Sequence, residues 1–275
     1  MVGKKLLKIG IVGCGAIGSS LAKAIVSDFS DKAQLSSLYD IDMPKVYNLA
    51  SSLGKKKISA SNLQDLINNV DLVIEATASE ASFDIALKAL SAGRSIMIMS
   101  VGGILEHLKE LEIVAQEKNA EIFIPSGAIC GIDGLKALGF GKINRVTLIS
   151  RKPPRAFKGN TYILKKKINL DQIKEDTVLF EGNANDAVDL FPQNINVAAT
   201  LSLAGLGALN TKVRIIASPA LERNIHEVEI DSESGKIFTR TENVTHPDNP
   251  KTSFLAVLSA IATLKQILEP VKIGT

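Results

Sequence analysis

The chain has 275 residues and 45% apolar residues, which is enough for one large domain or two ordinary domains with a sizeable core. The formal net charge of +3 is mild and aromatic residues make up 4%, which argues against a nucleic-acid-binding surface. No apolar run approaches the ~20 residues of a membrane span, and no long apolar signal segment precedes the first expected strand. We therefore expect a cytoplasmic protein that binds neither nucleic acid nor membrane.

The two cysteines, Cys14 and Cys130, are too few for a disulfide framework or a four-ligand zinc site. We expect each to be a small side chain in a glycine-rich turn, and we expect no bound metal. The two lysine runs, 55–57 and 165–167, are interpreted as solvated loop charge.

A predicted strand ends at Gly13, and a helical pattern begins two residues later. Between them lies a G-x-G-x-x-G motif made of Gly13, Gly15 and Gly18. The first glycine allows a tight turn, the second leaves room for a pyrophosphate, and the third lets the helix pack closely on the strand. The first turn of the helix, with Ala16 and Ile17, offers free N–H groups to the phosphates.

An acid follows the second expected strand, where this motif requires one. Asp40 stands 22 positions after Gly18 and is suited to accept hydrogen bonds from the adenosine ribose hydroxyls. Strand, helix and acid together favour dinucleotide binding over a glycine-rich turn without a ligand. Asp40 also repels a 2′-phosphate, which favours NAD over NADP, although Lys45 and the 55–57 run leave NADP open.

The first 125 residues alternate strand and helix patterns, which is typical of a parallel sheet with crossover helices, the Rossmann type of α/β fold. The expected strands are Leu7–Val12, Leu35–Tyr39, Leu72–Ala76, Ser95–Met99 and Glu121–Ile124. Ser61 and Gln64 form a capping-box pattern before the third strand. A helix over Phe83–Leu90 is predicted to end near Gly93, and Gly102-Gly103 opens the next helix.

Two turns of small residues follow the third and fourth expected strands, at 76–79 and 100–103. Ligands of open α/β sheets bind at the carboxyl ends of the strands. Ala76 and Thr77 are therefore candidates to contact the nicotinamide half of the cofactor. Small residues are also common in tight turns without a ligand, so the spacing alone leaves both interpretations open.

The strand–helix alternation ends at a glycine-rich loop that starts at Pro125. We predict a dinucleotide-binding domain over 1–124 and 250–275, and a catalytic, substrate-binding and oligomerisation domain over 125–249. The second domain is expected to be α+β with an open mixed sheet. Its expected strands are Arg145–Ser150, Thr177–Phe180, Lys212–Ala217, Ile225–Asp231 and Lys236–Thr241, the last two forming a hairpin, and its helices are Asn185–Leu190 and Val197–Leu206.

The last segment, Thr252–Leu268, has the spacing of an amphipathic helix. Its predicted apolar face consists of Phe254, Leu258, Ile261, Leu264 and Leu268. The Asp248-Asn249-Pro250 turn is interpreted as the signal that precedes its start. We expect this helix to return to the dinucleotide-binding domain.

Three histidines are the first candidates for proton transfer. His107 is expected on the surface in the middle of a helix, and His246 in a loop beside a proline. Alternation along the predicted strand places His226 on the same face as Val228 and Ile230. The pattern alone favours a buried core histidine over a general acid/base, and both interpretations stay open.

Other polar candidates lie around this strand. Glu227 and Glu229 are predicted to point to the face opposite His226. Asn194 and Asn196 precede a helix, where they serve either as N-caps or as amides that contact a ligand. Four basic residues are unranked candidates to hold a substrate carboxylate, namely Arg151, Lys152, Arg214 and Arg223.

Five blocks of the sequence resemble L-aspartate dehydrogenases, in the same order and over nearly the whole chain. They are the glycine motif at 11–18, Ser126-Gly127-Ala128-Ile129, the F-P-x-N-x-N block at 191–196 with Val197-Ala198-Ala199-Thr200, the segment 223–227 that contains the N-x-H-E block, and 248–253. The blocks of the second domain are specific, whereas many unrelated enzymes share the glycine motif.

The resemblance implies an NAD(P)-dependent oxidation of L-aspartate to iminoaspartate. The imine hydrolyses to oxaloacetate and ammonia, or supplies quinolinate formation in NAD biosynthesis. It further implies that His226 is catalytic, that Ala128 and Asn196 contact the cofactor, and that the protein is a homodimer or larger. The family often has glycine where this chain has Cys130.

Two alternatives are carried beside this one. The first is another enzyme of the same architecture, such as a relative of homoserine dehydrogenase or dihydrodipicolinate reductase, which would lack the F-P-x-N-x-N and N-x-H-E blocks. The second is a catalytically silent NAD sensor, against which the presence of His226 and the intact glycines argue.

Overall fold

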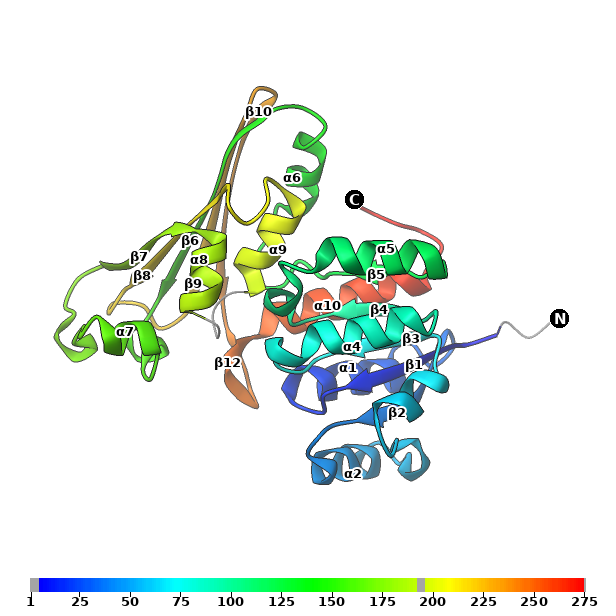
Figure 1. Cartoon of the computed structure of the whole chain (residues 1–275). Coiled ribbons are helices and arrows are strands. Elements are labelled where there is room, and N and C mark those ends of the chain that lie inside the picture. Colours follow the sequence, from blue (N-terminus) through cyan, green and yellow to red (C-terminus); the bar gives the residue numbers. More distant parts are fainter. Residues whose placement is uncertain (1–4, 192–195, 275) are drawn as a thin grey trace. The chain divides into compact units, whose positions relative to one another are not determined.

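The computed structural model describes residues 5–191 and 196–274. The chain divides into two compact units (Figure 1). The first extends to Pro125 and resumes over Val257–Lys272, and the second covers Ser126–Ala256. Each unit has its own hydrophobic core.

The first unit is built on a parallel five-stranded sheet in the order β2-β1-β3-β4-β5. The strands are β1 (Leu7–Val12), β2 (Ala33–Tyr39), β3 (Leu72–Glu75), β4 (Ser95–Ile98) and β5 (Ile122–Phe123). The connecting helices are α1 (Ala16–Ser27), α2 (Met43–Ser52), α3 (Leu63–Asn68), α4 (Ser79–Ser91) and α5 (Leu108–Lys118), with 3₁₀ turns η1 (Lys56–Ile58) and η2 (Val101–Ile104). All four residues of β3 are buried, as expected for a sheet covered on both faces.

The order of the strands reverses between β1 and β3, which lie side by side although β2 separates them in sequence. Crevices at such a reversal are where open α/β sheets bind their ligands. The glycine motif follows β1 and the Ala76 turn follows β3, so both predicted cofactor segments lie at this position.

The C-terminal helix α10 (Phe254–Leu268) contributes Ala260 and Leu264 to the core of the first unit. The predicted apolar face is wrong in part, because Val257, Ala260 and Leu264 are buried whereas Leu258 is 46% exposed. Leu264 of the predicted face is buried, and Ile261 and Leu268 pack against the same core. The core-facing side of the helix is therefore shifted towards Val257 and Ala260, and the small side chain of Ala260 allows close packing there.

The second unit contains a mixed sheet in the order β10-β9-β6-β8-β7, in which only β6 and β8 pair in parallel. Its strands are β6 (Ile143–Lys152), β7 (Thr177–Asn183), β8 (Thr211–Ala217), β9 (Asn224–Ser232) and β10 (Gly235–Asn243), beside the small pair β11 (Thr245–His246) and β12 (Asn249–Ser253). Its helices are α6 (Ile132–Leu138), α7 (Thr161–Lys165), α8 (Ala184–Leu190) and α9 (Asn196–Ala204), with 3₁₀ turns η3 (Pro154–Phe157) and η4 (Leu170–Gln172). Residues of α6, α8 and α9 join one face of this sheet in a single core.

The start of α3 differs by one residue from the predicted capping box. The side chain of Asn62 accepts a hydrogen bond from the N–H of Asp65 at 2.9 Å. The carboxylate of Asp65 in turn accepts from the N–H and the hydroxyl of Ser61. Asparagine caps a helix as well as serine does, so the Ser61–Gln64 pattern does not distinguish the two registers.

Two histidines occupy different settings from those predicted. His107 precedes α5 instead of lying within it, and its ring stacks on Phe83 with centroids 4.2 Å apart. His246 is buried in β11, where its Nδ1 accepts a hydrogen bond from the N–H of Asp248 at 3.1 Å. The Asp-Asn-Pro signal is therefore part of the β11–β12 pair, and α10 begins only at Phe254.

Candidate active site

The three glycines of the motif meet three different constraints. Gly13 has φ +96°, and a Cβ on it would clash with the carbonyl oxygen of Ala76. A Cβ on Gly18 would clash with the carbonyl of Gly13. Next to Gly15 there is open space in the part of the chain that the structure describes, where no atom beyond its two chain neighbours lies within 4 Å of the position that a Cβ would take. The first and third glycines are thus required by the fold, whereas the fold leaves the second free.

The N-terminus of α1 faces this open space. Gly15 precedes the helix in extended conformation, and no side chain caps it among the residues that the structure describes. The first turn contains Ala16 and Ile17, whose N–H groups belong to those that a helix leaves without intrahelical partners. Open space beside uncapped N–H groups at a positive helix end is a setting that fits a pyrophosphate.

Asp40 connects the end of β2 with the glycine motif. One carboxylate oxygen accepts the N–H of Cys14 at 2.7 Å, and the other accepts the N–H of Asp42 at 2.9 Å. These bonds orient the carboxylate beside the glycine motif. A carboxylate has about four acceptor sites, so two bonds leave capacity for the hydroxyls of a ribose.

The turn after β3 is organised by Glu75, a residue that our sequence analysis did not single out. Its buried carboxylate accepts the N–H and the hydroxyl of Thr77, each at 2.7 Å, and the N–H of Ser100 at 3.0 Å. The hydroxyl of Ser100 donates to the carbonyl of Thr77 at 2.7 Å. One carboxylate therefore ties the turns after β3 and β4 together, and holds Ala76 and Thr77 at the carboxyl edge. The only sequence signal was an acid at the end of an otherwise apolar strand.

In the second unit, His226 lies on β9 and is 4% exposed. Its Nδ1 is 2.8 Å from the hydroxyl of Ser150, which occupies the directly opposed position on β6. The side chain shares a face with Val228, as the alternation predicted, and this face is the one packed into the core. The ring is therefore held by the sheet and leaves Nε2 as its second functional atom.

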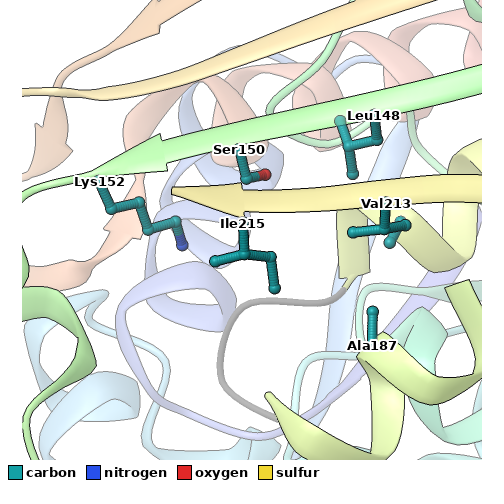
Figure 2. Close-up of a pocket in the computed structure, with 7 residues that line it drawn as sticks. Leu148, Ser150, Lys152, Ala187, Val213 and Ile215 are labelled. Carbon is teal, nitrogen blue, oxygen red and sulfur yellow. The ribbon is translucent and has the colours of Figure 1, made fainter. Parts of the chain in front are cut away.

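Lys152 lies two residues beyond Ser150 on the same strand and is likewise buried. Burial lowers the pKa of the Lys152 ammonium to about 8. Burial, followed by the positive charge of Lys152, lowers the pKa of His226 to about 3. In this structure the imidazole is therefore neutral at physiological pH, next to a cation on the same face of the sheet. Figure 2 shows Lys152 and Ser150 with the side chains around them.

The opposite face of the sheet carries a separate charge cluster. Glu227 accepts from the guanidinium groups of Arg151 at 3.2 Å and Arg240 at 2.8 Å. Arg151 also pairs with Asp176 at 2.8 Å. Glu227 thus points away from His226, as predicted, and these side chains are engaged with one another.

The Ala128 segment is held beside the His226 strand. The carbonyl of Ala128 accepts hydrogen bonds from Thr241 at 2.9 Å and Asn243 at 3.1 Å, both on β10. A Cβ on Gly127, which has φ +70°, would lie 3.9 Å from the side chain of Val197. The structure thereby brings the Ala128 segment close to the first turn of α9, which begins at Asn196.

The predicted site residues form two sets, one in each unit. Gly13, Gly15, Ala16, Ile17, Gly18, Asp40, Ala76 and Thr77 gather at the carboxyl edge of the first sheet. His226, Ala128 and Asn196 belong to the second unit. Asn194 lies outside the described residues.

Among the described residues, no three histidine, cysteine, aspartate or glutamate side chains are grouped so as to hold a metal ion. No helix in residues 5–191 or 196–274 is long and apolar enough to cross a membrane.

Family models match both units of the chain. Residues 13–125 match the homoserine dehydrogenase NAD-binding domain, and residues 133–267 match the aspartate dehydrogenase C-terminal domain. The second match contains His226 and Lys152.

Curated relatives match along nearly the whole chain. The L-aspartate dehydrogenase of Methanosarcina mazei is 47% identical over 98% of this chain and 100% of its own length. That of Methanothermobacter thermautotrophicus is 43% identical over 98% of this chain and 99% of its own length.

Among solved structures, aspartate dehydrogenase from Thermotoga maritima matches with a TM-score of 0.75 and 27% identity, covering 98% of this chain and 100% of that chain. A homoserine dehydrogenase from Thiobacillus denitrificans matches with a TM-score of 0.60 and 13% identity, covering 96% of this chain and 74% of that chain. The second likeness shows a shared fold and nothing further about activity.

Proposed function

The chain belongs to the L-aspartate dehydrogenase family, and we propose that it catalyses the NAD(P)-dependent oxidation of L-aspartate to iminoaspartate, with His226 as general acid/base. The imine then hydrolyses to oxaloacetate and ammonia. The observation that carries this proposal is the buried His226–Ser150 pair, on a strand within the match to the aspartate dehydrogenase C-terminal domain.

NAD(P) supplies the acceptor for the hydride that leaves Cα of the substrate. In the proposal, the N–H groups of Ala16 and Ile17 bind the pyrophosphate, next to the space left by Gly15. Asp40 binds the adenosine ribose. Ala76 and Thr77 in the first unit, and Ala128 and Asn196 in the second, are the remaining cofactor contacts.

His226 transfers the protons in this proposal. Loss of hydride from Cα leaves an imine only if the amine nitrogen also loses protons, and the neutral imidazole is available to accept one at Nε2. That role requires the tautomer in which Nδ1–H donates to the Ser150 hydroxyl, at the observed 2.8 Å. The same atom then returns the proton or activates the water that attacks the imine.

The test is the absorbance of the reduced nicotinamide with L-aspartate and NAD, then with oxaloacetate, ammonia and NADH. L-Homoserine, L-alanine and D-aspartate serve as comparison substrates. The variant His226→Ala is expected to lose about 10²–10⁴-fold in turnover with unchanged affinity for NAD, whereas the exposed His107→Ala keeps wild-type turnover. Near-wild-type turnover in His226→Ala would show that His226 takes no part in the mechanism. Turnover of L-homoserine but not of L-aspartate would show that L-homoserine, not L-aspartate, is the substrate.

Asp40 supports a preference for NAD, because its carboxylate lies beside the glycine motif, where a 2′-phosphate would be repelled. The variant Asp40→Ala is expected to lower the ratio of kcat/KM for NAD to that for NADP by about tenfold or more, on the scale of one charge interaction. An unchanged ratio would mean that residues other than Asp40 determine the preference for NAD over NADP.

We also propose a homodimer or larger assembly that uses the face of the second sheet opposite the helices. This face exposes Phe238 to 62% and Val178 to 44%, among the charged side chains around Glu227. Light scattering on the wild type and Phe238→Glu tests the assembly, since a buried carboxylate at a subunit contact would favour the monomer. A mass that is the same for both would exclude Phe238 from the contact.

The family resemblance further supports a cytoplasmic enzyme that supplies iminoaspartate for pyridine nucleotide biosynthesis. Formation of quinolinate in a coupled assay, with the enzyme as the only source of the imine, tests this role. An assay that yields oxaloacetate and ammonia without quinolinate would favour catabolism of aspartate.

A further inference from the structure

The four basic residues that sequence pattern left unranked are separated by the fold. Arg151 and Arg214 lie on the face of the second sheet opposite His226, paired with Glu227 and Glu181 respectively. Arg223 is exposed in the segment before β9. Lys152 is the one of these four that shares the face of His226.

The register of the sheet determines where Lys152 lies. Ser150 is opposed to His226 on β9, and Lys152 follows two residues later on the same face of β6, opposed to Ala217 on β8. Two residues along a strand span about 7 Å, the scale of a four-carbon dicarboxylate. The effect of Lys152 on the pKa of His226 agrees with this proximity.

The surroundings of Lys152 are largely apolar. A cavity of about 10 Å³ beside it is lined by Leu148, Ser150, Ala187, Ala198, Val213 and Ile215 (Figure 2). This volume is at most that of one water molecule, so solvent does little to screen the ammonium there. A buried cation of this kind interacts strongly with an anion that reaches it.

We propose that Lys152 binds a carboxylate of the substrate and so fixes the substrate next to His226. The proposal rests on the proposed function for the identity of the substrate as a dicarboxylic amino acid. It also gives this lysine a role that neither Arg151 nor Arg214 can fill from the other face.

The experiment compares Lys152→Met, Lys152→Arg and the control Arg214→Gln, which removes one positive charge from the opposite face of the same sheet. Calorimetry measures the binding of succinate, a dicarboxylate that cannot be oxidised at an amine, to the enzyme with NADH. Steady-state kinetics with L-aspartate gives KM and kcat for each variant.

Lys152→Met is expected to weaken succinate binding by about 30-fold or more and to raise KM for L-aspartate, because a desolvated charge pair is lost. Lys152→Arg is expected to recover part of the binding, and Arg214→Gln to match the wild type. Fluorescence titration with NADH should give the same affinity in all four proteins, which a merely misfolded variant would not do. If Lys152→Met does not fold, Lys152→Gln takes its place in the same comparison.

L-Asparagine distinguishes the two carboxylates of the substrate. An equal loss of kcat/KM for L-aspartate and L-asparagine assigns Lys152 to the α-carboxylate, and a loss confined to L-aspartate assigns it to the side-chain carboxylate. If folded Lys152→Met binds succinate as tightly as the wild type and has the same KM for L-aspartate, the role of Lys152 is wrong. Turnover of L-aspartate by these proteins would still support the proposed function. Succinate binding that depends on Lys152, in an enzyme inactive on L-aspartate, would overturn the proposed function alone.

Discussion

The hydroxyl of Ser150 and Nδ1 of His226 lie 2.8 Å apart, at directly opposed positions of β6 and β9. Both side chains are buried, and both are carried by neighbouring strands of one sheet rather than by loops. Backbone pairing therefore sets the orientation of the imidazole, and the hydroxyl determines which ring nitrogen is left for proton transfer.

Replacement of Ser150 by Ala removes the partner of Nδ1 while His226 stays in place. We expect kcat to fall by about tenfold, the effect of about 1.4 kcal/mol from one hydrogen bond, with unchanged affinity for NADH. Thr147→Ala on the opposite face of β6 is the matched control and should keep wild-type kcat. Equal kcat in Ser150→Ala and wild type would show that the ring needs no such partner.

In the glycine motif, a substitution at one position should affect cofactor binding and a substitution at another should affect the stability of the fold. The added methyl group in Gly15→Ala meets no atom of a non-neighbouring described residue within 4 Å, and Gly15 has an ordinary backbone conformation, so the Tm of this variant should equal that of the wild type. Its affinity for NADH should fall, because the methyl group occupies the space assigned to the pyrophosphate. Gly18→Ala would clash with the carbonyl of Gly13 and should lower the stability by about 1–3 kcal/mol.

Differential scanning fluorimetry and NADH titration separate these two effects. A lowered Tm in Gly15→Ala, or a wild-type Tm in Gly18→Ala, would contradict the assignment of the two glycines. Gly54→Ala is unsuitable as a control, because its φ of +66° makes a side chain strained even in open space.

The strands of the first unit were predictable to within two residues at each end, because buried parallel strands are rich in apolar residues and alternate here with helix patterns. The helix α2 was not predicted, since its apolar content is low and its buried row is short, with Val46, Leu49 and Ala50. The pair β11–β12 was missed for another reason. A turn signal such as Asp-Asn-Pro fits both a helix boundary and a hairpin, and tertiary pairing decides between them.

Candidate residues were identifiable where a local motif carries them, as for the three glycines and Asp40. The partners of His226 were not, because Ser150 lies 76 positions away in sequence and is brought to it by strand register. The ranking of Lys152 over Arg151 has the same origin: neighbouring residues of a strand point to opposite faces, and the sequence does not say which face holds the site.

Glu75 provides a test of how the carboxyl edge of the first sheet is held. In Glu75→Gln, one acceptor oxygen becomes an NH₂ group that faces the N–H of Thr77 or Ser100. Because this leaves buried donors unpaired, we expect a loss of about 1–3 kcal/mol in the free energy of unfolding and a higher KM for NAD. Urea denaturation measures the first effect, with the exposed Glu80→Gln as the control. Equal stability of the two variants would show that the Glu75 contacts do not hold these turns.

Lys152 should make the stability of the protein depend on pH in a defined window. The folded pKa of about 8 lies below the ordinary value of 10.5, so between these values the unfolded chain binds the proton and the folded chain does not. Stability attributable to this group therefore rises with pH from about 8 to 10.5, by at most about 3 kcal/mol, and the full cost of burying the ammonium applies below pH 8.

Lys152→Met, which keeps a long unbranched side chain, should be more stable than the wild type at pH 7.5. That advantage should shrink towards pH 10, when the free energy of unfolding of both proteins is measured by urea denaturation. A stability difference that stays constant with pH would mean that Lys152 keeps its ordinary pKa. If Lys152→Met is less stable than the wild type at pH 7.5, the lysine stabilises the fold and does not reduce stability for the sake of the site.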